Sequence, residues 1–215
     1  MKFRNANSAF KYLYKDIHNR GEDFGDTKAR FNVGITILHP DDCCITESWR
    51  GWSRDYAEAE WQWYLSGDPS TAKLGEIYGK VPAIWNRMSD SDGNVRSNYG
   101  WQWNREHQID KVIALLRNNP DTRQAAISIY DGKEINTYRK DTPCTYAVQF
   151  TIIEGKLCMS VYMRSNDLWF GFCNDQYCFS RLQRLVASEL GLQLGWYYHH
   201  AHNMHIYNNF LNRNK

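Results

Sequence analysis

The chain has 215 residues, of which 42% are hydrophobic and 15% aromatic, and this size fits one compact domain better than two. Its 26 basic and 24 acidic residues give a formal charge of +2, which argues against binding a nucleic-acid polymer but leaves room for a single phosphate group. The N-terminal sequence is polar and no apolar run is long enough to span a bilayer, so we expect a cytoplasmic protein with reduced cysteines and no membrane partner.

The spacing of apolar residues predicts the elements in chain order. The expected ranges are 7–19 (helix), 30–38 (strand), 54–66 (helix), 84–104 (turn-rich), 105–117 (helix), 125–130, 145–153 and 156–163 (strands), 175–190 (helix), 193–201 (strand) and a short helix from His205. Strands 145–153 and 156–163 flank Glu154-Gly155, which is typical of a tight hairpin turn. Because the order lacks regular strand–helix–strand alternation, we expect an α+β fold in a single domain over residues 1–215.

Neither the cysteines nor the histidines are arranged as metal ligands. No two cysteines have the C-x-x-C spacing, and the clustered histidines lack supporting cysteines: His199, His200, His202 and His205. Structural zinc sites usually combine such ligands at short, regular spacing. The sequence therefore predicts no bound metal.

Cys144 is the candidate nucleophile. It follows Asp141-Thr-Pro at the point where a turn leads into a predicted strand, a position at which a thiol can be exposed and reactive. The alternative is an inert small residue. A thiol needs a nearby cation to be ionised at neutral pH, and Arg164 stands one hairpin further along the chain. We therefore expect Cys144 and Arg164 to lie close together.

These motifs together resemble the thymidylate synthase family, in order and in spacing. The matching segments are Pro143-Cys144, Val148-Gln149-Phe150, Arg164-Ser165-Asn166-Asp167, Gly171 and His205-Ile206-Tyr207, with Glu60 ahead of Trp63-Tyr64-Leu65-Ser66-Gly67-Asp68, then Trp85, Asn98-Tyr99-Gly100 and Asn119-Pro120-Asp121-Thr122-Arg123. The resemblance runs from about residue 30 to 210. It implies a mixed β-sheet packed with helices and a homodimer formed sheet to sheet.

The resemblance also implies a role for each matched residue. Cys144 would attack carbon 6 of a pyrimidine nucleotide, and carbon 5 would then take the one-carbon unit of 5,10-methylenetetrahydrofolate. Glu60 would manage protons, through water, at the base and the departing folate. The binding residues would be Arg164 and Ser165 for the 5′-phosphate, Arg123 for the phosphate of the partner subunit, His205 and Tyr207 for the 3′-hydroxyl, Trp85 and Tyr99 for the folate site, and Asp167 near base and folate.

The residue that reads the base departs from the synthase pattern. Synthases acting on uracil carry an asparagine after a Leu-Pro-Phe-like run, whereas here Asp175 follows Phe172-Cys173-Asn174. A carboxylate only accepts hydrogen bonds, so it repels O4 of uracil but suits the amino group and the protonated N3 of cytosine. The string around it resembles the phage deoxycytidylate hydroxymethylase branch, which supplies modified precursor for phage DNA. The alternative for Asp175 is a helix cap, and it could serve both roles.

Further departures affect the phosphate and folate sites. Gln124 stands where many members have a second phosphate arginine, and Thr145 replaces the usual histidine. Lys28 and Arg30 are the candidates for the missing N-terminal phosphate-loop arginine. No long tail follows His205 to fold over the folate, so we expect water to quench the intermediate and give a hydroxymethyl product.

Three activities compete on this sequence. The first is deoxycytidylate 5-hydroxymethyltransferase, with dCMP and methylenetetrahydrofolate as substrates. A C5-methyltransferase on dCMP, or a thymidylate synthase on dUMP, is the near rival on the same scaffold. From another class comes a non-catalytic single-strand nucleic-acid binder that exploits the aromatic residues, against which the missing basic groove and the Cys144/Glu60 pair both argue.

Overall fold

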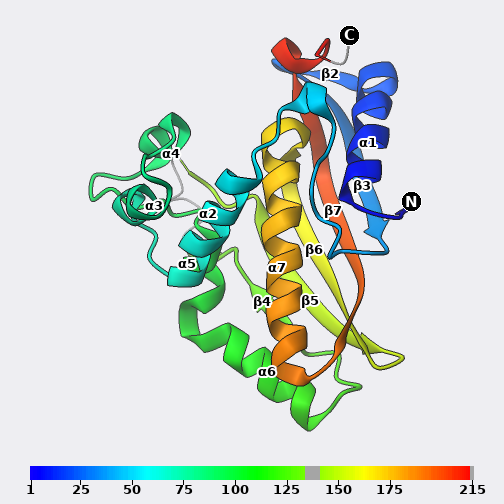
Figure 1. Cartoon of the computed structure of the whole chain (residues 1–215), viewed down its shortest axis with the longest axis vertical. Helices are drawn as coiled ribbons and strands as arrows, with labels where there is room; N and C mark the ends of the chain where they lie inside the picture. The colour runs from blue at the N-terminus through cyan, green and yellow to red at the C-terminus, as the bar shows by residue number, and fades with distance from the viewer. Residues whose placement is uncertain (134–140, 214–215) are drawn as a thin grey trace.

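The computed structural model describes residues 1–133 and 141–213, which form a mixed sheet covered by helices (Figure 1). The strand order is β1-β3-β7-β6-β5-β4, with β2 paired to β3 outside this path. The strands are β1 (Lys2–Phe3), β2 (Glu22–Phe24), β3 (Thr27–Ile37), β4 (Ala126–Ser128), β5 (Thr145–Ile153), β6 (Lys156–Asp167) and β7 (Gln193–Tyr207). The sheet is mixed because β6 and β7 run parallel while β3 and β5 pair antiparallel with them. The expected α+β class is confirmed.

Helices of different lengths cover one face of the sheet. They are α1 (Ala6–Arg20), α2 (Arg54–Ser66), α3 (Thr71–Tyr78), α4 (Ala83–Met88), α5 (Tyr99–Asn104), α6 (Gln108–Asn118) and α7 (Cys173–Leu190). In Figure 1, α7 crosses in front of β6 and β7, and its apolar residues form the core with the inward side chains of the sheet. On the side of the sheet away from α7, the ring of Tyr162 stacks on Tyr146 and meets Tyr198 edge-on.

The central strands bring distant parts of the sequence together. The β5–β6 hairpin closes at Glu154 and Gly155, which both have positive φ as a type I′ turn requires. The parallel pairing of β6 with β7 places Asp167 opposite His205. The motif at the end of β6 therefore lies beside the motif at the end of β7.

Several segments differ from the sequence prediction, which did not include β1, β2 or α3 and ended the strand of β6 at residue 163. The stretch 84–104 contains helices α4 and α5, which are too short to show a helical period. The helix expected from His205 is wrong, because β7 continues to Tyr207 through its pairing with β3, and only a 3₁₀ turn follows at Asn208–Phe210. The helix expected at 175–190 begins earlier, at Cys173, after a π-helical segment at Leu168–Phe172.

In the part of the chain that the structure describes, no helix has the length and apolar character needed to cross a membrane.

Gly100 fixes how closely α5 approaches α2. A Cβ at this position would overlap the backbone of Tyr64. We predict that Gly100→Ala lowers the free energy of unfolding by about 2 kcal/mol, as overpacking does, although alanine normally favours a helix. Denaturant unfolding measures the loss. Gly132→Ala is the matched control, since a Cβ there meets nothing within 4 Å; an equal effect of the two variants would contradict the steric argument.

Candidate active site

Cys144 and Arg164 lie together at the edge where β5 begins and β6 ends. The backbone N–H of Arg164 donates to the carbonyl of Cys144 at 2.8 Å, and its Nη2 lies 3.7 Å from the Cys144 Sγ. The same guanidinium donates to the carbonyls of Thr142 (2.8 Å) and Pro143 (3.1 Å), so it is held against the turn that carries the cysteine. The expected proximity of thiol and cation is confirmed.

The thiol is nonetheless protonated in the ligand-free protein. Burial raises the pKa of Cys144 to about 11, because the favourable charge of Arg164 is opposed by Asp175, Asp141 and Asp167. Proximity to Arg164 alone therefore does not ionise the thiol at neutral pH in this state. The thiol proton has to leave as the sulfur forms its bond, so reactivity depends on what the bound substrate changes around it.

Glu60 lies on the inner face of α2 and is 4% exposed. The helix begins at the Ser53 cap and ends at Gly67 in the left-handed conformation, which fixes the position of the carboxyl. Burial, followed by the charge of Asp175, raises the pKa of Glu60 to about 8. Hydrogen bonds from Tyr56, whose Oη lies 3.2 Å from Glu60 Oε1, and from Tyr64 and Asn174 oppose this rise only in part. At neutral pH Glu60 carries a proton and can act as an acid.

Asp175 stands in the first turn of α7 but does not cap it. The helix begins at Cys173, its cap residue Phe172 makes no side-chain hydrogen bond, and Asp175 Oδ2 instead accepts from Asn166 Nδ2 at 2.7 Å. Burial raises the pKa of Asp175 to about 7, and Asp167 adds to the rise while the Asn166 bond lowers it. The capping alternative is excluded, and the carboxyl points toward the groups around Cys144 and Glu60.

The side chain of Asn174, one residue earlier, contacts Glu60, whereas Asn166 contacts Asp175. Its Oδ1 accepts from Trp52 Nε1 at 2.9 Å, and its side chain hydrogen bonds to Glu60. Asn174 therefore places an amide beside the buried acid.

The other predicted binding residues lie at the same end of β6 and β7. Ser165 and Asp167 alternate with Asn166 on β6, opposite Asn203 and His205 of β7. Asp167 accepts from the backbone N–H groups of residues 169 and 170, so its carboxylate caps the N-terminus of the π-helical segment. Tyr207 is 39% exposed and packs edge-on against His205, and both rings border the solvent.

The two aromatic residues predicted for the folate site differ in exposure. Trp85 on α4 is half-buried, packs edge-on against Trp63 and donates from Nε1 to Tyr56 Oη at 2.7 Å. Tyr99 on α5 is 5% exposed and packs against Phe179. Trp85 is thus linked through Tyr56 to Glu60, which joins an aromatic surface to the acid.

The cations outside β6 that were predicted to bind phosphate differ in their exposure and in their ion pairs. Arg123 is exposed on the loop before β4, and Gln124 beside it is exposed as well. Arg30 pairs with the buried Asp16, whereas Lys28, on β3 opposite Ile206 of β7, has only a 3.7 Å contact with an exposed aspartate. Lys28 is therefore less committed than Arg30 to an internal ion pair.

Sequence reasoning missed the polar residues behind Asp175. His199 is fully buried, its Nε2 lies 3.0 Å from Asn166 Oδ1, and its Nδ1 lies 2.7 Å from Tyr197 Oη. The sequence signal was slight: His199 is a polar residue within the predicted strand 193–201, and Asn166 lies beyond the end of the predicted strand 156–163. Pairing β6 with β7 was needed to see that these residues meet.

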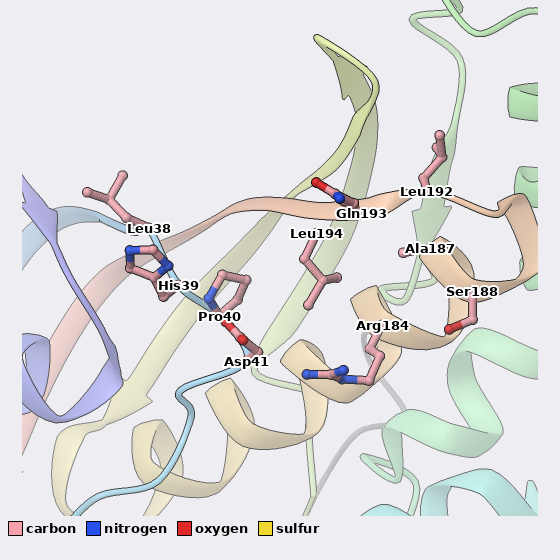
Figure 2. A pocket seen from close by; sticks show the side chains of 10 residues that line it. All are labelled: Leu38, His39, Pro40, Asp41, Arg184, Ala187, Ser188, Leu192, Gln193 and Leu194. Atoms are coloured by element: carbon pink, nitrogen blue, oxygen red, sulfur yellow. The ribbon is translucent and has the colours of Figure 1, made fainter.

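A shallow pocket of about 370 Å³ lies away from this cluster (Figure 2). Figure 2 shows its lining from residues 38–41, the end of α7 and residues 192–194. None of the cysteine, carboxyl or arginine groups described above lines it. Within residues 1–133 and 141–213, no group of three or more His, Cys, Asp or Glu side chains is placed to hold a metal ion.

Comparison with known proteins gives the same family throughout. The family profile described as thymidylate synthase matches residues 50–215. A thymidylate synthase of Corynebacterium aurimucosum is 32% identical over 161 residues, 71% of this chain and 59% of that protein. The deoxycytidylate 5-hydroxymethyltransferase of Enterobacteria phage T4 is 37% identical over 143 residues, 62% of this chain and 56% of that protein.

The match therefore spans less than three fifths of the length of either curated relative. Among solved structures, the thermostable thymidylate synthase A of Bacillus subtilis superposes with a TM-score of 0.76 at 23% identity, covering 94% of this chain and 80% of that one. This likeness confirms the expected fold.

The raised pKa of Glu60 makes the fold less stable as pH rises. Between the ordinary carboxyl pKa of 4.5 and the folded value of about 8, the unfolded chain ionises Glu60 while the folded chain does not. We predict that Glu60→Gln, which does not titrate, melts at least about 3 °C above the wild type at pH 8 but close to it at pH 5.

Glu58→Gln is the control from the same helix. Burial raises the pKa of Glu58, but hydrogen bonds from Tyr177 and Gln62 and the charge of Arg181 outweigh it and lower the pKa overall. Its ionised form is favoured by folding, so this variant should lose stability at pH 8. The melting temperature of each variant is measured by calorimetry at both pH values. If the two variants change their melting temperatures in the same direction at pH 8, the raised pKa of Glu60 is refuted.

Proposed function

Because the chain belongs to the thymidylate synthase family, we propose that it transfers a one-carbon unit from 5,10-methylenetetrahydrofolate to carbon 5 of dCMP and releases 5-hydroxymethyl-dCMP. The observation that carries this proposal is the Asp175 carboxyl, held by Asn166 in one site with Cys144 and Glu60. A carboxyl stands there in place of the amide expected for uracil.

Cys144 is the proposed nucleophile for carbon 6 of the base. Its Sγ lies on the accessible edge of the sheet beside Arg164, and the thiol is partly exposed. Addition at carbon 6 makes carbon 5 nucleophilic, which splits one difficult substitution into two easier steps. The protonated Glu60 then serves as the proton donor and acceptor at the base and at the departing folate.

Asp175 is the proposed reader of the base. Cytosine presents its 4-amino group as a donor and needs one proton between N3 and a carboxyl oxygen. A pKa of about 7 means that Asp175 holds or releases such a proton near neutral pH. Mispairing a polar group of this kind discriminates between substrates by roughly 10⁴-fold.

The strand ends supply the proposed contacts to phosphate and sugar. Arg164 and Ser165 would bind the 5′-phosphate, with Arg123 of the partner subunit, and His205 and Tyr207 would hold the 3′-hydroxyl. Arg164 keeps part of its guanidinium exposed while two backbone carbonyls orient it, which suits a bidentate phosphate contact.

The folate is proposed to bind along the aromatic surface that Trp85 and Tyr99 border, with Asp167 at its inner end. The fit rests on the half-buried Trp85 ring and its link through Tyr56 to Glu60. When bound, methylenetetrahydrofolate supplies the one-carbon unit. The residues of the chain orient it, shield the reacting atoms and move protons at Glu60.

Water rather than hydride is proposed to complete the reaction. Asn174 makes the wall beside Glu60 polar, and an amide with a carboxyl can hold a water molecule near carbon 5. The similarity to a phage deoxycytidylate 5-hydroxymethyltransferase supports this choice. The second candidate is methyl transfer to dUMP, which the similarity to a thymidylate synthase favours.

The partner contribution of Arg123 requires a homodimer, which we also propose. The side of the sheet away from α7 carries Tyr146, Tyr162, Tyr198 and His200, whose rings contact one another across three strands. Tyr146 is 37% exposed. An aromatic surface of this kind is suited to burial against the same surface of a second copy.

We predict that Asp175→Asn shifts preference from dCMP toward dUMP, because the amide gains a donor for O4 and can no longer share a proton with N3. The readout is kcat/KM for each nucleotide with methylenetetrahydrofolate. Cys144→Ser, which should bind nucleotide but not turn over, sets the background. An unchanged ratio would place base recognition elsewhere.

The product distinguishes the two quenching reactions. With dCMP, we predict a nucleotide whose mass rises by a hydroxymethyl group, while the folate is recovered as tetrahydrofolate. Mass spectrometry of the nucleotide and absorbance of the folate measure both products in one reaction. Dihydrofolate formed in step with a methylated nucleotide would overturn the hydroxymethyl assignment and leave the role of Cys144 intact.

A further inference from the structure

A directed line of hydrogen bonds ends on Asp175. Tyr197 Oη lies 2.7 Å from His199 Nδ1, His199 Nε2 lies 3.0 Å from Asn166 Oδ1, and Asn166 Nδ2 donates to Asp175 Oδ2 at 2.7 Å. Tyr197 and His199 are completely buried and Asn166 is 2% exposed. None of these three side chains belongs to the nucleotide or folate contacts proposed above.

The direction of each bond follows from the one before it. Asn166 must present its amide nitrogen to the carboxylate, so its oxygen faces His199 and needs a donor. His199 therefore carries its proton on Nε2. Burial lowers the pKa of His199 to about 3, so the ring is neutral, and its bare Nδ1 accepts from the Tyr197 hydroxyl. All three donors point toward Asp175.

This direction makes the two oxygens of Asp175 chemically different. Oδ2 faces an N–H and cannot carry a proton toward it, so an exchangeable proton resides on Oδ1. Space around the bond is tight, because a Cβ on Gly171 would lie 2.9 Å from Asn166 Nδ2 and 3.3 Å from Asp175 Oδ2. Glycine at this position leaves the pair undisturbed.

We propose that His199 and Asn166 are specificity-determining positioning residues that confine the proton of Asp175 to Oδ1 and thereby make the carboxyl tell cytosine from uracil. This inference rests on the proposed role of Asp175 as the reader of the base. With Oδ1–H at N3 and Oδ2 at the 4-amino group, the N3 atom of cytosine meets a donor and its 4-amino group meets an acceptor. Uracil places N3–H against Oδ1–H and O4 against Oδ2, and both contacts are repulsive.

Removing the lock should let the carboxyl accept either base. In His199→Phe the Asn166 amide can rotate away from Asp175, which leaves Oδ2 free to carry the proton; a carboxyl protonated on Oδ2 donates to O4 of uracil while Oδ1 accepts from N3–H. We expect kcat/KM for dUMP to rise in absolute terms and the dCMP-to-dUMP ratio to fall by at least about tenfold. Tyr197→Phe, which only frees the tautomer of His199, should give a smaller shift in the same direction.

A gain of activity on dUMP is the decisive readout, because a merely destabilised protein loses activity on both nucleotides. His202→Phe is the control, since this exposed histidine of the same strand bonds to Asn32 and not to the Asp175 line. If His199→Phe and His202→Phe leave the ratio equally unchanged while Asp175→Asn shifts it, the proton lock is refuted and the base-reading role of Asp175 stands.

The two proposals fail in different ways. A wild-type preference for dUMP that Asp175→Asn does not alter would refute the proposed function. The lock would fall with it, because the lock requires Asp175 to read the base. Equal loss of kcat/KM on both nucleotides in Asn166→Ala and His199→Phe would show a structural role only and overturn it.

Discussion

The constraint on which this site depends is the crowding of acidic groups in a place that water scarcely reaches. The charge of Asp175 raises the pKa of Glu60, and the charge of Asp167 raises the pKa of Asp175. Burial and neighbouring carboxyls together raise the pKa of Cys144. Groups of this kind cannot all ionise together, because desolvation and like charge both disfavour it. The ligand-free site therefore holds protons at neutral pH.

The fold supplies the donors that make this crowding tolerable. Tyr56 and Asn174 hydrogen bond to Glu60, and each is itself held by a tryptophan N–H, from Trp85 and Trp52. Asp175 has its own line of donors through β6 and β7. These two strands are central in the sheet and pair in parallel, so the atoms behind Asp175 belong to the most constrained part of the molecule. Side chains whose geometry must stay fixed are best carried by rigid elements such as these strands.

Much of the architecture could be predicted from sequence, and the failures have physical causes. The β5–β6 hairpin follows from strict alternation around Glu154 and Gly155, both local features. Helices α4 and α5 are short and packed by tryptophans, and β7 extends to Tyr207 because β3 pairs with it, which no local pattern reveals. Similarly, the closeness of Cys144 and Arg164 follows from one hairpin. The protonation of Cys144 depends on carboxyls of α7 and β6 as well as on Asp141 of its own turn, and the line behind Asp175 depends on a strand pairing between residues 33 positions apart.

An amide and a carboxyl read a base by different physics. An asparagine side chain has a donor and an acceptor by its chemistry, and orientation alone decides which faces the base. A carboxyl has two equivalent oxygens, so it acquires an order of donor and acceptor only when its surroundings break that symmetry. Asn166 breaks it here, and the neutrality of His199 is what preserves the break, since an imidazolium would no longer accept from Tyr197 and could shift the amide. Under the proposed lock, exchanging asparagine for aspartate at the position of Asp175 changes specificity cleanly only where a buried donor stands behind it, and the polar residues inside the core contribute to the specificity of the site.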